Sequence, residues 1–366
     1  MINRYQFLKQ IIQFFFSIVA FVNFPLANIK KTLSSKKNFK TSALPDSGPW
    51  PTSDPFLFCV HHVDNYPKAN DNMGPDENLN GRNIGNDFSN KNGWSMYHGE
   101  KIPGFPRHPH RGFETITIVD KGLIDHSDSL GYSARYGDGD VQWLTAGDGI
   151  QHSEMFPLLN KNKPNINNFF QIWINLKSSK KRVAPNFSML WKDEIPKITE
   201  YDINNKKTEI EIIAGSYKGN NAPAPPPNSW ANDKDNYVNI WKIKLDKNAQ
   251  FVLPRVNTDI FRSLYFYKGD SIIVNDQEIK SRMMIEVDNF DELEIASIND
   301  ESYILLLQAK PINEPIVKYG PFVMNSREEI QEAFNDYQKT GFGDWDWHDD
   351  GPVHGDEYKK FAIGDN

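Results

Sequence analysis

The sequence lacks three features that would each indicate a class of function. It has one cysteine, Cys59, so no disulfide can form within the chain, and a lone thiol in an apolar strand is more typical of a core than of a nucleophile. It has no excess of positive charge, because 48 acidic residues outnumber 41 basic ones and the net charge is -7. We therefore expect no direct binding of nucleic acid. No histidine lies between His152 and His348, which excludes a second histidine-based metal site in that half of the chain.

What the sequence does contain is enough apolar residue for a folded protein of two domains: 366 residues, 39% hydrophobic and 13% aromatic. Short alternating, β-branched runs separated by glycine turns predict antiparallel sandwiches or barrels in both halves. In the first half these runs are Phe56–Val60, Phe113–Val119, Leu123–His126, Val141–Leu144 and Phe169–Leu176. We interpret Phe113–Val119 and Leu123–His126 as the two arms of a hairpin.

Two segments have other patterns. Residues 64–101 are dense in Asn, Asp and Gly without periodicity, which predicts a large loop insertion, either a functional cover or a mobile decoration. Asn325 with Glu328 resembles a helix start, and Ile330, Ala333, Phe334 and Tyr337 follow at helical spacing. The aromatic tail after Thr340 is expected to pack back on the body.

The N-terminal 40 residues form a separate problem. A mostly apolar run over 11–27 behind Arg4 and Lys9 resembles a signal peptide or a short anchor. However, Pro25 and the interrupting Gln13 and Asn23 fit poorly, and the lysines that follow would favour retention in the cytoplasm. Export and retention both stay open, and any membrane contact is expected only through residues 1–27.

The chemistry is concentrated in two short stretches. Side chains alternate faces along a strand, so His108, His110 and Glu114 are expected on one face, and His152 and Glu154 also share a face. Two such strands side by side would place three imidazoles and one or two carboxylates around one point. This pattern predicts a metal site, because imidazole and carboxylate together suit Fe, Mn, Co, Ni, Cu or Zn.

The remaining histidines have simpler interpretations. His61 and His62 are expected on a strand surface, and His126 is expected in solvent at a hairpin. His98 lies just before the site in the sequence, and lining of the mouth of the site is a minor alternative for it. His348 and His354 are expected to make local hydrogen bonds in the tail. Trp143 and Trp173 are expected to pack in the core rather than to form a substrate platform.

The runs Phe105-Pro-Arg-His-Pro-His-Arg-Gly-Phe-Glu-Thr, Asp125-His-Ser-Asp-Ser-Leu-Gly, Gly139-Asp-Val-Gln-Trp-Leu-Thr-Ala-Gly and Gly149-Ile-Gln-His-Ser-Glu together resemble the pirin family of the cupin superfamily. Tyr319-Gly-Pro-Phe-Val-Met-Asn does so too, and the resemblance extends from about Gly48 to the end. Thr145 and the extra residue before His152 depart from the general cupin pattern but match the pirin variant.

The resemblance implies an all-β bicupin, two antiparallel barrels facing each other with a short C-terminal helix, and a metal in the first barrel only. We expect an extension over 1–45, the metal-binding cupin over 46–200, the second cupin over 201–325, and a helix with an aromatic tail over 326–366. The resemblance assigns His108, His110, His152 and Glu154 as ligands and places Glu114 behind them. It favours Fe(II) among the divalent metals.

Two functions from different classes follow from the resemblance. The first is a quercetin 2,3-dioxygenase type of oxidoreductase, in which Glu154 is the catalytic base and a flavonol and dioxygen are the substrates. The second is a non-enzymatic iron and redox sensor that binds a protein partner. A metal kept only for stability is a third possibility. The resemblance also implies a cytoplasmic monomer.

Overall fold

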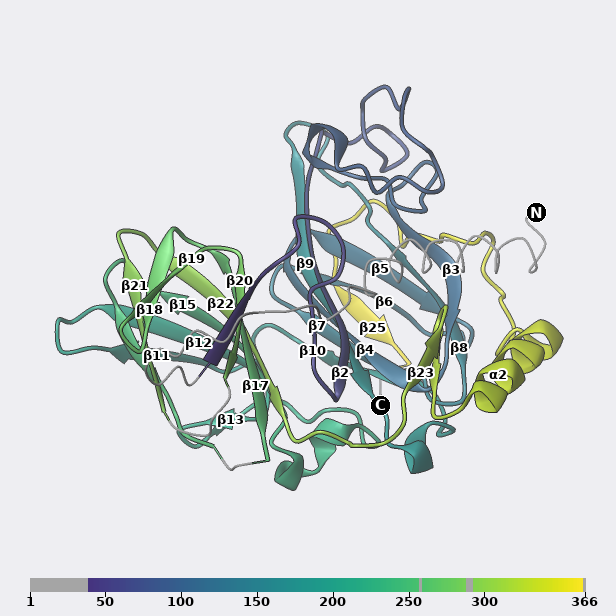
Figure 1. Cartoon of the computed structure of the whole chain (residues 1–366). Helices are drawn as coiled ribbons and strands as arrows, with labels where there is room; N and C mark the ends of the chain where they lie inside the picture. The colour runs from purple at the N-terminus through teal and green to yellow at the C-terminus, as the bar shows by residue number, and fades with distance from the viewer. Residues whose placement is uncertain (1–38, 257–258, 288–291, 365–366) are drawn as a thin grey trace. The chain divides into compact units, whose positions relative to one another are not determined.

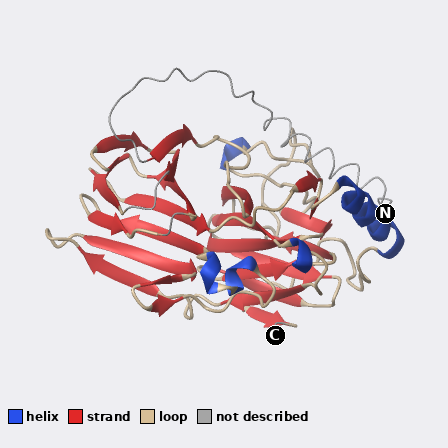
Figure 2. Ribbon diagram, turned by 60° about the horizontal axis from the view of Figure 1, so that its bottom comes forward, coloured by secondary structure: helices blue, strands red, loops and turns tan. Residues whose placement is uncertain are grey.

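The computed structural model describes residues 39–256, 259–287 and 292–364. The predicted signal-like or anchoring segment lies outside these residues. Within them, we find no helix that combines the length and the apolar character needed to cross a membrane. Strands dominate the described chain, as the all-β prediction requires, and α2 (Arg327–Thr340) is its one α-helix (Figure 2).

The described residues divide into two compact units. Residues 60–192 and 314–364 form the first, so the C-terminal helix and tail belong with the N-terminal strands. Residues 39–59 and 193–313 form the second.

The first unit contains two antiparallel five-stranded sheets, which are labelled in Figure 1. One has the order β10-β7-β4-β9-β2. Its strands are β2 (Phe56–Tyr66), β4 (Phe113–Lys121), β7 (Val141–Thr145), β9 (Asn165–Asn175) and β10 (Asn186–Leu190). The other, which we call the histidine sheet, has the order β25-β6-β5-β8-β3. Its strands are β3 (Gly104–His110), β5 (Leu123–Asp128), β6 (Ser133–Gly137), β8 (Ile150–Met155) and β25 (Phe361–Ile363).

The predicted hairpin between Phe113–Val119 and Leu123–His126 is wrong. Both strands form, but β4 pairs with β7 and β9, whereas β5 pairs with β6 and β8 in the other sheet. Gly122 has φ +89°, and its Cα lies so close to Ile166 and Asn167 that a Cβ would clash. The chain therefore turns a corner between sheets at this glycine, and alternation within a strand cannot reveal which partner the strand takes.

The long loop begins after β2 and has its own packing. Apart from the 3₁₀ turn η1 (Lys91–Gly93), its conformation is irregular up to β3. Trp94 and Met96 are buried with Tyr66 and Leu158. The guanidinium of Arg82 lies 3.3 Å from the ring centroid of Trp94 and forms a 2.8 Å ion pair with buried Asp87. These contacts anchor the loop to the first unit.

At the C-terminus, the strands β23 (Val317–Tyr319) and β24 (Phe322–Met324) form a hairpin, and α2 packs on it through Ile330, Ala333 and Tyr337. The helix begins one residue later than predicted. Its N-cap is Ser326, which accepts a hydrogen bond from the Glu329 amide in a capping box. Gly341, with φ +66°, ends the helix.

The second unit has a seven-stranded sheet, β1-β20-β17-β22-β15-β12-β11, and a four-stranded sheet, β16-β21-β18-β19. The seven are β1 (Phe39–Ala43), β11 (Lys197–Tyr201), β12 (Lys207–Ala214), β15 (Asn239–Leu245), β17 (Phe261–Lys268), β20 (Met283–Val287) and β22 (Ser302–Ala309). The four are β16 (Gln250–Leu253), β18 (Ser271–Val274), β19 (Gln277–Lys280) and β21 (Leu293–Ile298). The short pieces are β13 (Ser216–Tyr217), β14 (Asn220–Asn221), η3 (Trp230–Asn232) and η4 (Lys234–Asn236), while η2 (Ser178–Lys180) belongs to the first unit.

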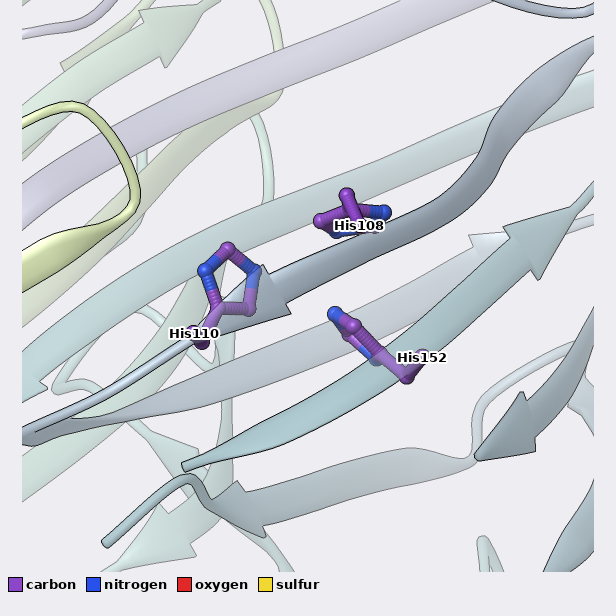
Figure 3. Close-up of side chains that lie close together, drawn as sticks. All are labelled: His108, His110 and His152. Carbon is purple, nitrogen blue, oxygen red and sulfur yellow. The ribbon is translucent and has the colours of Figure 1, made fainter. Parts of the chain in front are cut away.

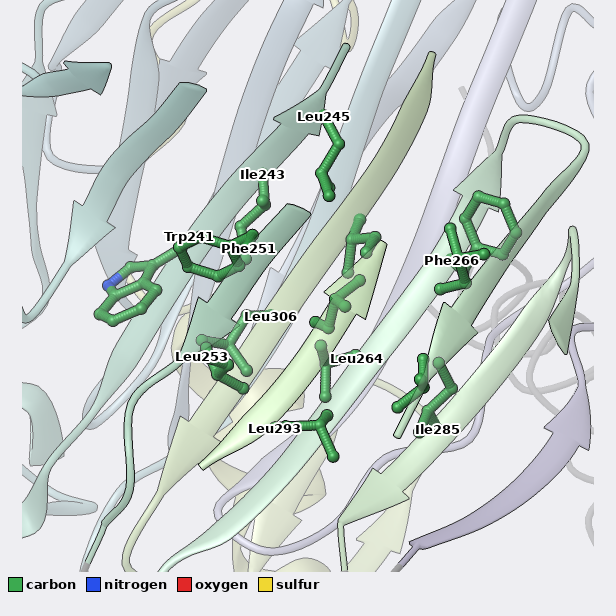
Figure 4. Packing of buried hydrophobic residues seen from close by; sticks show 14 of the residues in the cluster. Trp241, Ile243, Leu245, Phe251, Leu253, Leu264, Phe266, Ile285, Leu293 and Leu306 are labelled. Atoms are coloured by element: carbon green, nitrogen blue, oxygen red, sulfur yellow. The ribbon is translucent and has the colours of Figure 1, made fainter. Parts of the chain in front are cut away.

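The interior of the second unit is apolar. Ile243, Leu264 and Leu306 of the larger sheet pack with Phe251 and Leu293 of the smaller one (Figure 4). This filling agrees with the absence of histidine from that part of the sequence.

Candidate metal centre

The two histidine-bearing stretches are neighbouring antiparallel strands, β3 and β8. His108 lies directly opposite His152, and His110 lies opposite Ile150. A β-bulge between Phe105 and His108 shifts the register, so that Phe105 rather than residue 106 is opposite Glu154. Figure 3 shows the rings of His108, His110 and His152 gathered beside these two strands.

The three imidazoles form a group in which one ring nitrogen from each lies within 4.8 Å of the others. His110 and His152 are buried and His108 is half-buried. Neither ring nitrogen of His152 has a hydrogen-bond partner among the described residues, and Nδ1 of His110 has none either. Buried polar atoms are normally satisfied, and each neutral imidazole has one nitrogen with a lone pair, so one nitrogen of each ring fits an ion that would take that lone pair.

Burial also keeps these rings in the ligating form. It lowers the pKa of His108 to about 4, although the hydrogen bond from its Nδ1 to the Pro106 carbonyl (2.9 Å) opposes the shift. The pKa values of His110 and His152 are lowered well below the ordinary value, first by burial and then by neighbouring imidazoles. A neutral imidazole offers a lone pair, and the Pro106 carbonyl leaves Nε2 of His108 as the free nitrogen.

Glu154 lies next to this group. One of its carboxylate oxygens is 4.0 Å from Nε2 of His152. Gln171 donates to both carboxylate oxygens (3.1 and 2.9 Å), and the Thr117 hydroxyl donates to one of them (3.2 Å). Burial raises the pKa of Glu154, while the Gln171 hydrogen bond opposes the rise. Its coordination of a metal stays a prediction.

Glu114 does not share a strand with the histidines. The backbone turns at Gly112, so Glu114 belongs to β4 in the opposite sheet, where it is buried and accepts a 2.6 Å hydrogen bond from the Thr145 hydroxyl. The expectation that it shares a strand face with His108 and His110 is therefore wrong. Its supporting role behind the ligands stays a prediction.

His126 is not in solvent, contrary to the prediction. It is fully buried, its ring centroid is 5.5 Å from that of His152, and its Nε2 donates to the Asp128 carboxylate (3.0 Å). The reason is the corner at Gly122, which puts β5 beside β8 instead of in a surface hairpin. The prediction that His354 makes a local hydrogen bond is also wrong, because its Nε2 donates to the carbonyl of His126 (2.8 Å), which is far away in the sequence.

The other histidines and the tryptophans are closer to expectation. His61 contacts Asn168, and Nδ1 of His62 lies 2.8 Å from the Tyr97 hydroxyl. His98 is half-buried beside Phe105, whose ring centroid is 6.3 Å from that of His108. Trp143 and Trp173 are buried, as predicted, and Trp173 packs 5.5 Å from the His110 ring.

Sequence reasoning missed the residues that hold Glu154. Thr117 of β4 and Gln171 of β9 lie directly opposite each other, and both donate to the Glu154 carboxylate. A glutamine between Phe170 and Ile172 in an otherwise apolar strand was the available signal, because a polar residue in a buried strand needs a partner.

Lys181 was missed as well. Its buried ammonium donates to the Gly112 carbonyl (2.7 Å), the Val323 carbonyl (3.0 Å) and the Asn175 side chain (2.7 Å). The loop that follows His110 is thereby joined to β24. Gly112 has φ +86°, and a Cβ there would lie 2.0 Å from the Val323 carbonyl, so only glycine fits this approach.

Comparison with known proteins agrees with this geometry. The Pirin family model matches residues 53–174, and the model for the Pirin C-terminal cupin domain matches residues 240–343. Pirin-1 of Arabidopsis thaliana is 35% identical over 246 residues, which are 65% of this chain and 79% of that protein. The chain belongs to the pirin family.

A second relative, in Pseudomonas aeruginosa, carries the name "Putative quercetin 2,3-dioxygenase" and is 34% identical over 65% of this chain and 79% of its own length. Among solved structures, a quercetin 2,3-dioxygenase from Acinetobacter baumannii has a TM-score of 0.63 at 27% identity, covering 79% of this pirin-family chain and 86% of that one. The cupin architecture and the pirin resemblance are therefore confirmed.

Proposed function

We propose that the first unit is a metal-dependent dioxygenase site that opens the heterocycle of a flavonol, as in quercetin 2,3-dioxygenases. The main supporting observation is a group of three imidazoles, of which His110 and His152 are buried and His108 is half-buried. Neither nitrogen of His152 has a hydrogen-bond partner among the described residues, and the buried Glu154 carboxylate lies beside this ring. The names of the Pseudomonas aeruginosa relative and the Acinetobacter baumannii structure support this class of substrate.

His108, His110, His152 and Glu154 would hold one divalent transition metal, with Fe(II) favoured by the family resemblance and Mn, Co, Ni, Cu or Zn also compatible with these donors. The metal would supply Lewis acidity and open positions for a substrate oxygen and dioxygen. Three imidazoles and one carboxylate leave up to two positions of an octahedron, which the two substrates need together.

The protein's own chemistry centres on Glu154. A flavonol hydroxyl must lose its proton before the ring can react, and a carboxylate oxygen of Glu154 would accept that proton. Burial raises the pKa of this carboxyl, which makes it a better base than an exposed glutamate. Gln171 and Thr117 fix the orientation of both oxygens.

The rings around the histidines suit a flat phenolic molecule. Phe105 borders His108, and Trp173 borders His110. Half-buried Phe105 would orient a planar substrate by ring contacts, whereas Trp173, which is packed in the core, would only shield His110 from water.

A protein-binding redox sensor is the second candidate, because several relatives are named pirin with no activity in their names. It would use the same metal ligands without turnover. The two candidates differ in whether dioxygen is consumed.

The test begins with the full chain purified without added metal, whose bound element is identified by mass spectrometry. Flavonol loss under oxygen is then followed together with carbon monoxide release. We expect turnover that His110→Ala and Glu154→Ala abolish, whereas His348→Ala, a solvent-exposed tail histidine paired only locally with Asp349, keeps full activity. A chain that holds iron but consumes no flavonol would favour the sensor.

A further inference from the structure

The C-terminal tail lies beyond the family model, which ends at residue 343, yet it makes an ordered path over the histidine sheet. We call residues 344–364 the strap. Figure 1 shows this chain, in yellow, leaving α2 and returning as β25. Trp347 donates a 2.9 Å hydrogen bond to the Asp128 carbonyl at the end of β5, and from Asp350 onward the strap meets the strands in the order in which they lie in the sheet.

The path starts at β3. The amide of Arg107 donates to the Asp350 carbonyl (2.6 Å), and the Arg107 guanidinium forms a 3.0 Å ion pair with the Asp350 carboxylate. Gly351 of the strap then packs against Met155 of β8, so closely that a Cβ at Gly351 would lie 3.1 Å from the Met155 sulfur. The strap thus crosses from one edge of the sheet to its neighbour.

It then reaches β5 and β6. The backbone amide of His354 donates to the Asp125 carboxylate (2.7 Å), and its ring donates to the His126 carbonyl. The carbonyls of Gly355 and Glu357 accept from the Arg135 guanidinium. Finally β25 pairs with β6 and completes the far edge, with Phe361 opposite Arg135.

The strap lies on the face opposite the metal ligands. The His126 ring packs on the His152 ring, so the flanking Asp125 and Ser127 point the other way, and these are the residues that His354 contacts. Under the strap, Asp125 and Arg135 form a fully buried, two-bond ion pair with both distances 2.7 Å. A buried arginine needs its donors satisfied, and the strap carbonyls of Gly355 and Glu357 accept from two of the three N–H groups that Asp125 leaves.

The contact at β3 has a particular consequence for the metal ligands. This strand is an edge of its sheet, and the bulge before His108 interrupts its ladder with β8. Edge strands are held on one side only. The long loop holds the start of β3 at Gly104 through the Met96 carbonyl and the His98 amide. The strap holds the strand further on, at Arg107, the residue immediately before His108.

From these contacts we infer that the strap is a positioning element, which fixes β3 against β8 and thereby sets the spacing of His108 and His110 from His152. Its effect on metal affinity rests on the proposed metal site. Its effect on β3 does not, because the contacts exist without an ion.

The experiment compares the full chain with His354→Ala, Asp350→Ala and a chain ending at Gly343. Affinity for Co(II) is measured by competition with a chromophoric chelator, and the visible absorption of the Co(II) form reports ligand geometry. Hydrogen exchange of the peptide covering 104–110 reports β3 directly. His348→Ala is the matched control within the strap, since that exposed ring pairs with Asp349.

We expect His354→Ala and Asp350→Ala to weaken Co(II) binding about fivefold or more, to shift the visible spectrum and to speed exchange over 104–110. His354→Gln, which can still donate to the His126 carbonyl, should restore most of the affinity, and His348→Ala should match the unaltered chain. If the shortened chain keeps its exchange rate over 104–110, its spectrum and its affinity while only its melting temperature falls, the positioning role is refuted.

If the unaltered chain binds no Co(II), the proposed metal site fails, and the exchange over 104–110 still decides whether the strap holds β3. The two failures are therefore distinguishable.

Discussion

Gln171→Leu is the substitution that most directly probes how the site is held. Leucine is one atom shorter than glutamine and cannot donate, so Glu154 loses the amide that bonds both of its carboxylate oxygens at 3.1 and 2.9 Å. The fold should survive, because Gln171 is only half-buried and its backbone stays in the β4–β9 ladder.

The magnitude follows from the charge on the acceptor. A hydrogen bond to a charged group contributes about 1.5–3 kcal/mol, and the loss of a group that orients a metal ligand lowers metal affinity by about 10–100-fold. Thr117 retains one hydrogen bond to the carboxylate at 3.2 Å, so we expect the lower half of that range.

The assay is competition for Zn(II) or Co(II) between the purified chain and a chromophoric chelator. Asn168→Leu is the matched control, because Asn168 lies on the same strand but bonds His61. An affinity of Gln171→Leu equal to that of the control would mean that Glu154 is not a ligand or that its orientation does not depend on Gln171.

Two further predictions concern stability in the first unit. Burial raises the pKa of Asp64 to about 7, so the folded chain favours the protonated carboxyl. The protonated group therefore contributes fully to the free energy of unfolding below about pH 4, and this contribution is lost as the pH rises to about 7. Asp64→Asn should therefore gain stability relative to the unaltered chain as the pH rises from about 4 to about 7, by about 1.4 kcal/mol per pH unit at most, and the difference should be constant above that range. Urea unfolding at each pH measures the difference, and a value that does not change between about pH 4 and about pH 7 would contradict the prediction. Lys181→Met leaves three buried acceptors without their donor and should destabilise the fold by about 3 kcal/mol, measured as a lower melting temperature, whereas Lys180→Met on the exposed turn next to it should change little.

The sequence predicts the strands and the histidine group well, and the reason is local. Alternation along β3 places His108 and His110 on one face, and alternation along β8 does the same for His152 and Glu154. The two residues of each pair are only two positions apart, so their relation depends on local strand geometry alone. His108 and His152 then meet because their two strands pair.

The errors are non-local. The placement of His126, His354 and Glu114 depends on which strands become neighbours, and that is decided by corners such as Gly122 and Gly112 rather than by strand pattern. A glycine in a turn signal indicates a change of direction, but it does not distinguish a hairpin from a crossing to another sheet. His354 is linked to His126 across more than 200 residues, and no periodicity carries that information.

The two units differ in the polarity of their interiors. Both bury apolar residues between antiparallel sheets, but one interior region of the first unit is polar. There, Thr117 and Gln171 of one sheet donate to Glu154 of the other, where His126 and Asp128 lie beside His152. Burying such groups costs stability unless each finds a partner. Most do, through Thr117, Gln171 and Asp128, whereas both nitrogens of His152 do not. A cation bound by the three imidazoles would take the lone pair of one ring nitrogen of His152, whereas the interior of the second unit around Leu264, Ile243 and Leu306 is apolar.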